Sequence, residues 1–146
     1  MWKAPGVTAS NREAVMGNVE IVQAIYEAFG RGDVQAILDH LAEDIAWDLD
    51  APGYGIPIYE PGTGKEHVQG FFAALQGVEF LRFEPTNFLS GGNQVAVPIQ
   101  VEARVKATGK VVEALEIHLW TFGENRLVSR FFHCIDRHAF VLAYGL

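Results

Sequence analysis

The residues best suited to chemistry lie on a segment, residues 111–122, that alternates like a β-strand. Glu116, His118 and Trp120 share one face of this segment, and aliphatic residues occupy the other. A carboxylate and an imidazole held beside an indole could transfer protons or polarise a carbonyl group. This segment is therefore the first candidate for a functional surface.

The next segment, residues 126–136, places four more side chains on one face if no bulge shifts its alternation. They are Arg130, Phe132, Cys134 and Asp136. In one interpretation both polar faces meet solvent, but Trp120, Phe132 and Cys134 would then be exposed together, which is uncommon on monomers. In the other, a curved sheet has one face around a pocket and one face against a partner chain.

Other chemistries lack the residues that they need. The stretch 62–65 (GTGK) is not a phosphate-binding loop, because Tyr59 stands in place of the required upstream glycine and Glu66 follows the lysine. The five histidines have no metal-ligand spacing, and a single cysteine, Cys134, allows no internal disulfide. We therefore expect no metal and no other cofactor.

Composition narrows the class of partner. The chain has 146 residues, 49% hydrophobic and 20% charged, as in a globular domain. Its net charge of −7 disfavours nucleic acid and anionic lipid, and no apolar run is long enough for a membrane span. We expect one domain over residues 1–146, with residues 1–10 as a flexible leader, in a cytoplasmic protein. Ten Phe, three Trp and four Tyr suit either an aromatic core or a ligand held among rings.

Helices are predicted to precede the strands. Apolar residues over 22–29 follow the helical period, and the glycines of 30–32 end that helix. Asp33 can cap a short second helix. Residues 10–13 and 63–66 both have capping-box spacing, the second at the start of a third helix.

The remaining segments predict a sheet. Residues 44–49 alternate, with Ile45, Trp47 and Leu49 facing inward. Residues 51–62, with three prolines, three glycines and two tyrosines, form a loop that could cover a site. Four strands over residues 80–136 form an antiparallel meander. Helices followed by strands predict an α+β fold, a curved antiparallel sheet wrapped around three N-terminal helices.

Several stretches identify a family. Residues 25–33 (IYEAFGRGD) and 41–47 (LAEDIAW) resemble the start of SnoaL-like proteins, of the nuclear transport factor 2-like superfamily. Residues 62–72, the turn at 108–110 and residues 116–136 are similar to later parts of the family, so the resemblance covers about residues 18–138.

This resemblance implies a cone, in which a strongly curved sheet and three helices enclose an apolar pocket, with frequent dimerisation through the outer sheet face. Known members include ketosteroid isomerases, polyketide cyclases, epoxide hydrolases, dehydratases and non-enzymes. The reaction therefore has to be argued from the site.

The resemblance also implies roles for two hydrogen-bonding residues. Tyr26 falls where ketosteroid isomerases keep an oxyanion-stabilising tyrosine, and His118 falls close to their second oxyanion donor. Tyr26 is equally well explained as a core residue on an amphipathic helix.

The resemblance points to Asp136 as the base. The aspartate base of the isomerases corresponds to Leu49, and we expect Asp48 and Asp50 to point the other way. Asp136 matches an aspartate that SnoaL-like cyclases use for proton transfer, and burial among rings would suit it to carbon acids.

The expected pocket wall is largely aromatic. Its predicted rings are Trp47, Tyr54, Tyr59, Phe71, Phe72, Trp120 and Phe132. Arg130 would either anchor a ligand carboxylate or pair with Glu116. Epoxide hydrolysis is disfavoured, because Glu116-x-His118 replaces the Arg-x-Asp expected for that reaction.

The leading hypothesis is cofactor-free acid/base catalysis, of the isomerase, cyclase or dehydratase type, on an apolar cyclic or carbonyl compound. Asp136 would be the base, with Tyr26 and His118 as donors to the oxyanion. A binding protein for a small apolar ligand, or an interaction module with a solvated polar face, are the alternatives. We also expect a homodimer through an apolar sheet face, formed by Val97, Ile99, Val101, Ile117 and Leu119.

Overall fold

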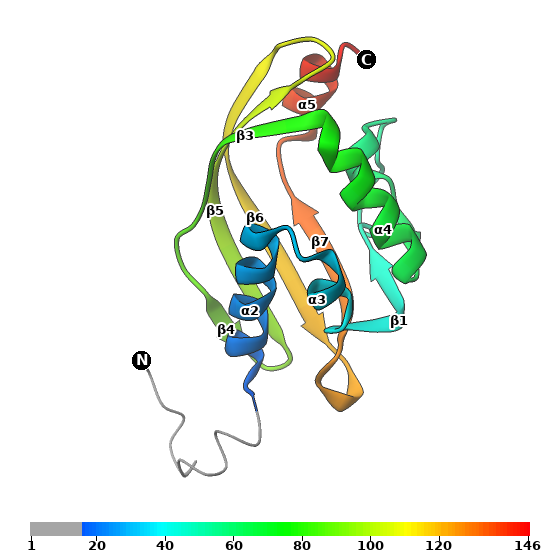
Figure 1. The fold of residues 1–146 in the computed structure, drawn as a ribbon, viewed down its shortest axis with the longest axis vertical. Coiled ribbons are helices and arrows are strands. Elements are labelled where there is room, and N and C mark those ends of the chain that lie inside the picture. The colour runs from blue at the N-terminus through cyan, green and yellow to red at the C-terminus, as the bar shows by residue number, and fades with distance from the viewer. Residues whose placement is uncertain (1–15) are drawn as a thin grey trace.

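Two helices near the start of the chain lie against the concave face of a curved sheet (Figure 1). The computed structural model describes residues 16–146, so the predicted capping box at 10–13 lies outside it. Helices α2 (Asn18–Arg31) and α3 (Val34–Leu38) confirm the first two predicted helices. The chain leaves α2 at Gly32, whose φ of 71° suits a residue without a Cβ. The Asp33 carboxylate caps α3 by accepting from the backbone N–H of Ala36 at 3.1 Å.

Helix α4 (Lys65–Ala74) confirms the third predicted helix but not its predicted cap. The N-cap residue is Gly64, with φ of 92°, and no side chain caps this end. Thr63 instead belongs to the short strand β2 (Gly62–Thr63), which pairs with β1. The backbone N–H of Gly64 donates to the carbonyl of Ile45 at 2.8 Å, which ties the start of α4 to the sheet.

A helix that the sequence analysis missed, α5 (Arg137–Tyr144), follows the last strand. Its N-cap is Asp136, whose carboxylate accepts from the backbone N–H of Ala139 at 3.0 Å. Figure 1 shows α5 at one end of the sheet, beside the turn between β5 and β6. Thr108 in that turn donates to the carbonyl of Ala143 and holds the helix there.

The sheet confirms the α+β prediction. Its strands run in the order β2-β1-β7-β6-β5-β3, with β4 paired to β5. The strands not yet given are β1 (Leu41–Trp47), β3 (Val78–Pro85), β4 (Leu89–Gly91), β5 (Gln94–Val105), β6 (Val111–Phe122) and β7 (Val128–Cys134). Short 3₁₀ turns cover Pro57–Tyr59, Leu75–Gly77 and Glu124–Arg126.

One pairing departs from the predicted antiparallel sheet. Strand β1 lies parallel to β7, with Trp47 opposite Phe131, so the sheet is mixed. A parallel pair needs a long connection, and most of the chain lies between these two strands.

A β-bulge near the start of β7 reverses the predicted alternation of that strand. Phe122 pairs with Val128 and Thr121 pairs with Arg130, so β7 has one extra residue between these pairs. Beyond the bulge His118 pairs with His133, and both histidines face the inside of the curve.

The buried core lies between this concave face and the helices. It includes Val22 and Ile25 from α2, Ile45 from β1, and alternate residues of β5 from Val95 to Val105. No helix in the part of the chain described here is long and apolar enough to cross a membrane.

The aliphatic residues of β5 and β6 lie on opposite faces of the sheet, contrary to the predicted shared face. Val97 pairs with His118 and is fully buried on the concave side. Ile117 pairs with Pro98 on the outer side, where Leu115 is 55% exposed. The apolar residues of the outer face therefore come from β6 and β7, because the valines of β5 point to the concave side.

Candidate active site

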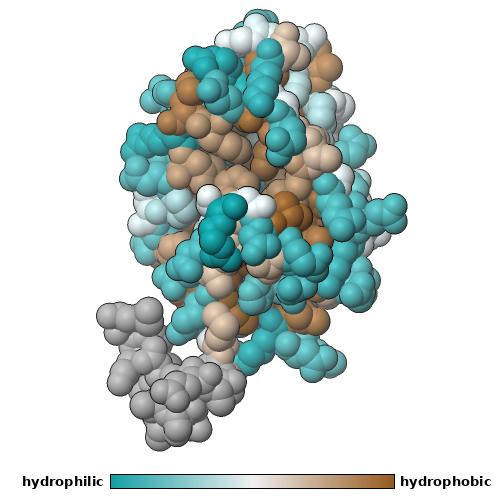
Figure 2. All heavy atoms as spheres, in the orientation of Figure 1, coloured by the Kyte–Doolittle hydropathy of each residue, from teal (hydrophilic) through white to brown (hydrophobic). Residues whose placement is uncertain are grey.

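An internal cavity of about 60 Å³ lies between the concave face of the sheet and the helices. Most of its wall is apolar, and among residues 16–146 the carboxylate and imidazole groups that line it belong to Glu116, His118 and His133. Half-buried rings, among them Phe72 and Phe83, line its outer part. Figure 2 shows an apolar hollow between β3 and α4 on this face.

Many of the predicted wall residues do line this cavity. The rings are Trp47, Tyr59, Phe71, Phe72 and Trp120, and the polar residues are Tyr26, Glu116 and His118. Glu116, His118 and Trp120 reach it together because the uninterrupted alternation of β6 turns its even-numbered residues inward, as predicted. Their catalytic or binding roles stay predictions.

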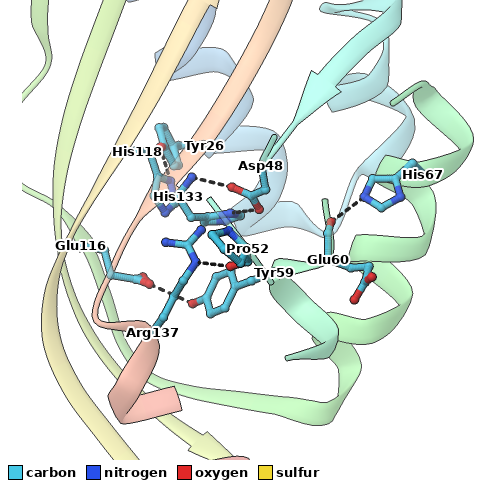
Figure 3. A network of polar contacts seen from close by, with 10 residues as sticks. All are labelled: Tyr26, Asp48, Pro52, Tyr59, Glu60, His67, Glu116, His118, His133 and Arg137. Carbon is cyan, nitrogen blue, oxygen red and sulfur yellow. Dashed lines mark hydrogen bonds and ion pairs between the residues drawn. The ribbon is translucent and has the colours of Figure 1, made fainter. Parts of the chain in front are cut away.

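The strongest polar contact at the cavity joins Asp48 and His133. The backbone N–H of His133 donates to Asp48 Oδ1 at 2.8 Å, and its Nδ1 lies 2.7 Å from Oδ2 (Figure 3). Asp48 is completely buried and His133 is 4% exposed. Because a carboxylate only accepts hydrogen bonds, Nδ1 carries a ring proton, and in the neutral imidazole Nε2 then holds the lone pair.

The backbone at Asp48 explains why this side chain turns inward. Its φ of 56° ends the alternation of β1, while its N–H still donates to the carbonyl of Phe131 at 2.9 Å. Aspartate tolerates this left-handed conformation better than most residues. Leu49, predicted to face inward, is consequently 45% exposed.

A second hydrogen-bonded chain ends at His118. Trp120 Nε1 donates to the Tyr26 hydroxyl at 3.0 Å, and that hydroxyl lies 2.7 Å from His118 Nδ1. An indole can only donate, so the Tyr26 oxygen accepts from it, and in the tautomer that we assign the hydroxyl proton is donated to His118 Nδ1. Burial raises the pKa of Tyr26, which keeps this proton in place. His118 then carries its own proton on Nε2, which is buried and has no partner.

The imidazole of His118 stays neutral in the folded protein. Burial, and secondly the charge of His133 when protonated, hold the pKa of His118 well below its ordinary value. The two imidazole rings lie 4.8 Å apart and almost perpendicular. A neutral Nε2–H facing a cavity can polarise a carbonyl oxygen.

Glu116 supplies a buried carboxyl group on the same wall. It accepts a hydrogen bond from the Tyr59 hydroxyl at 3.1 Å, and burial raises its pKa. Two neighbours lower that pKa: His133 when it is protonated, and the Tyr59 hydroxyl through its hydrogen bond. Glu116 lies two residues from His118 along β6, about 7 Å away on the same face.

Four predicted site residues lie away from the cavity wall. Asp136, predicted to be the buried base, is exposed and caps α5. Arg130 forms an exposed ion pair with Asp50 at 2.6 Å, rather than with Glu116. Phe132 lies on the outer face under the Arg137 guanidinium, and Tyr54 is 62% exposed. Apart from Tyr54, these placements follow from the bulge in β7 and from the helix after it.

The sequence analysis also missed residues that the structure brings to the cavity. His133 and Phe131 come from β7, and Phe140 comes from α5. The sequence does contain a signal for His133. If His133 is paired with His118 across the hairpin, both histidines lie on the same face of the sheet. Within residues 16–146, no group of three or more His, Cys, Asp or Glu side chains could hold a metal ion.

The lowered pKa of His118 predicts a pH-dependent contribution to stability. The unfolded chain takes up a proton near about pH 6.5 that the folded protein does not, so this contribution is present above about pH 6.5 and is lost as pH falls. From about pH 7 to about pH 5, the stability of wild type should fall relative to His118→Gln, by at most about 1.4 kcal/mol per pH unit. Urea denaturation of both proteins measures this difference. A constant difference would contradict a neutral buried His118.

Glu116 changes the stability in the opposite direction over part of the same pH range. For this reason the wild type is compared with His118→Gln at each pH. Its raised pKa means that its contribution is lost as pH rises above the unfolded value of about 4.5. Both proteins contain Glu116, so its effect is common to the two measurements.

Comparison with known proteins finds a family match and solved structures of the same fold. Residues 22–131 match the model of the SnoaL-like domain. An NTF2-like protein from Burkholderia xenovorans LB400 is 31% identical, with 86% of this chain and 94% of that chain covered and a TM-score of 0.75. The search of curated proteins found no match.

Two further structures share the fold at lower identity. An NTF2-like protein from Burkholderia pseudomallei K96243 is 24% identical, with 90% of this chain and 100% of that chain covered and a TM-score of 0.77. A candidate polyketide cyclase from Pseudomonas putida KT2440 is 19% identical, with coverage of 88% and 98% and a TM-score of 0.73.

Proposed function

The chain belongs to the SnoaL-like domain family, and from this premise we propose that it performs cofactor-free acid/base catalysis on a small apolar carbonyl compound. The observation that carries the proposal is the buried pair of Asp48 and His133, in which His133 lines a largely apolar cavity. Neighbouring structures described as candidate polyketide cyclases and a candidate isomerase are consistent with this class of reaction.

His133 is the base in this proposal. Asp48 holds the proton on Nδ1, so Nε2 accepts a proton from the carbon next to the carbonyl group. The carboxylate then stabilises the imidazolium that forms, as a buried aspartate does in a catalytic triad. Return of the proton to another carbon isomerises the compound. Attack of the carbanion on a second carbonyl carbon of the same molecule closes a ring, with the new alkoxide taking the proton from the imidazolium. Loss of a β-hydroxyl group, which takes that proton and leaves as water, gives the unsaturated carbonyl compound.

His118 is the donor to the oxygen on which negative charge develops. Its Nε2–H has no acceptor in the described part of the chain, so a ligand carbonyl would supply one. Tyr26 and Trp120 position it, because their hydrogen bonds fix the proton on Nε2. Glu116, whose pKa is raised, is placed to give a proton back to the ligand.

The test is exchange of α-protons for deuterium, which requires no knowledge of the natural substrate. Cyclohexanone and the bicyclic 2-tetralone would be incubated with the protein in D₂O and followed by proton NMR. We expect faster exchange than in buffer at the same pH. The matched control is Asp136→Asn, which should keep the acceleration because asparagine also caps helices and the residue lies outside the cavity.

A binding protein for a small apolar ligand is the second candidate, favoured by the largely apolar wall. A cavity of about 60 Å³ is smaller than the roughly 150 Å³ cavity that holds benzene, so a ring requires the half-buried phenylalanines to move apart. Binding of the ketones without any exchange would favour this candidate over catalysis.

We further propose that two copies associate through the outer face of the sheet. Leu115, Ile117 and Phe132 on this face are exposed or half-buried, and a second copy would cover them. Light scattering should give a dimer mass for the wild type. Leu115→Glu should give a monomer at the same concentration, because a charge there opposes burial of the face. An unchanged mass in the variant, or a monomeric wild type, would contradict the proposal.

A further inference from the structure

The described residues contain four buried side-chain donors or acceptors without a partner, and two of them belong to residues that line the cavity. These two are Trp47 Nε1 and His118 Nε2. The other two, on Arg137 and Tyr144, belong to residues that do not line it. A buried polar group without a partner is costly, so each one calls for an explanation.

Both cavity atoms are donors. An indole N–H can only donate, and the hydrogen bond from Tyr26 fixes the proton of His118 on Nε2. Two residues of the wall therefore carry N–H groups from which no atom of the described residues accepts. A hydrocarbon ligand would leave both unsatisfied, whereas oxygen atoms on the ligand would satisfy them.

The two donors stand on strands on either side of β7. Trp47 is the last residue of β1 and His118 lies on β6, two strand spacings across the sheet and two residues along it, or about 12 Å apart at the backbone. Phe131 and His133 lie between them, with the Trp47 ring 4.2 Å from Phe131 and the His118 ring 4.8 Å from His133. This separation favours two acceptor oxygens over one shared oxygen.

We propose that the cavity takes an apolar cyclic compound with two acceptor oxygens, one bound by Trp47 Nε1–H and one by His118 Nε2–H. The inference deepens the proposed function and rests on it for the apolar carbonyl ligand. It adds Trp47 as a binding residue and places the base, His133, between the two oxygens. A carbon between two carbonyl groups loses a proton readily, because both oxygens share the charge.

The test uses a pair of probes that differ by one carbonyl group. They are 2,2-dimethylcyclohexane-1,3-dione and 2,2-dimethylcyclohexanone, and neither has a proton on the dimethylated carbon. Three tryptophans give three indole signals in a ¹H–¹⁵N spectrum, and Trp47→Phe identifies one of them. On titration with the dione, the Trp47 indole proton should move downfield as it gains an acceptor. The Trp120 signal, already bonded to Tyr26, is the internal control.

Affinity gives the second readout. Wild type should bind the dione about two- to tenfold more tightly than the monoketone, the worth of one net hydrogen bond, and Trp47→Phe should lose that preference. An unmoved Trp47 signal, a preference that survives in Trp47→Phe, or no binding of either probe would overturn the inference. A wrong assignment of His133 as the base would give a different result. Proton exchange would then persist in a His133 variant, while the wild type would still bind the dione more tightly than the monoketone.

Discussion

Replacing His133 by glutamine is expected to lower protein-catalysed α-proton exchange of the ketones by about 10²- to 10⁴-fold. Glutamine has no group that takes a proton near neutral pH, although its amide can still donate to Asp48 in place of Nδ1. The loss should therefore reflect the missing base rather than a broken contact. Proton NMR in D₂O measures it directly.

Two further variants separate this effect from a general loss of structure. Asp48→Asn should also lose most of the exchange, because an amide no longer holds the Nδ1 proton of His133 as a carboxylate does. His138→Gln, on the exposed side of α5, should leave the rate unchanged. Full exchange by His133→Gln would remove His133 as the base.

Replacing Phe131 by alanine is expected to lower the free energy of unfolding by about 3–5 kcal/mol. The Phe131 ring is 2% exposed and lies against four rings of the cavity wall, Trp47, His118, Trp120 and His133. Its centroid lies 4.2 Å from Trp47, 4.4 Å from Trp120 and 4.5 Å from His133. Removing it leaves a void beneath the residues that we propose bind and react with the ligand. Each kcal/mol of lost stability should lower Tm by about 2–4 °C.

The neighbouring Phe132 is the matched control for this substitution. Its ring lies on the outer face, half-buried, with the Arg137 guanidinium 5.2 Å away. Phe132→Ala should therefore cost much less, mainly a cation–π contact of about 0.5–1 kcal/mol and some partly buried area. Thermal and urea denaturation of both variants would test this. Equal losses would contradict the assignment of the two faces of β7.

The sequence predicts the inner face of β6 correctly because nothing interrupts its alternation. Glu116, His118 and Trp120 all line the cavity, as expected from a period of two. The helices α2 and α3 were also predictable, since the Gly32 stop and the Asp33 cap are local signals. Local rules therefore suffice for about half of the site.

The other half depends on events that local periodicity does not encode. One extra residue in β7 turned Phe131 and His133 inward and placed Phe132 outside. A single left-handed residue, Asp48, ended the alternation of β1. Asp136, to which the family resemblance points as the base, instead follows β7 and caps helix α5 with its carboxylate.

The most direct test of the proposed base is the protonation of the His133 ring in the wild-type protein. Long-range ¹H–¹⁵N correlation spectra at neutral pH report on each imidazole nitrogen. The proposal requires a protonated Nδ1, which lies 2.7 Å from the Asp48 carboxylate, and an unprotonated Nε2 that can take the proton. A protonated Nε2 at neutral pH would contradict His133 as the base.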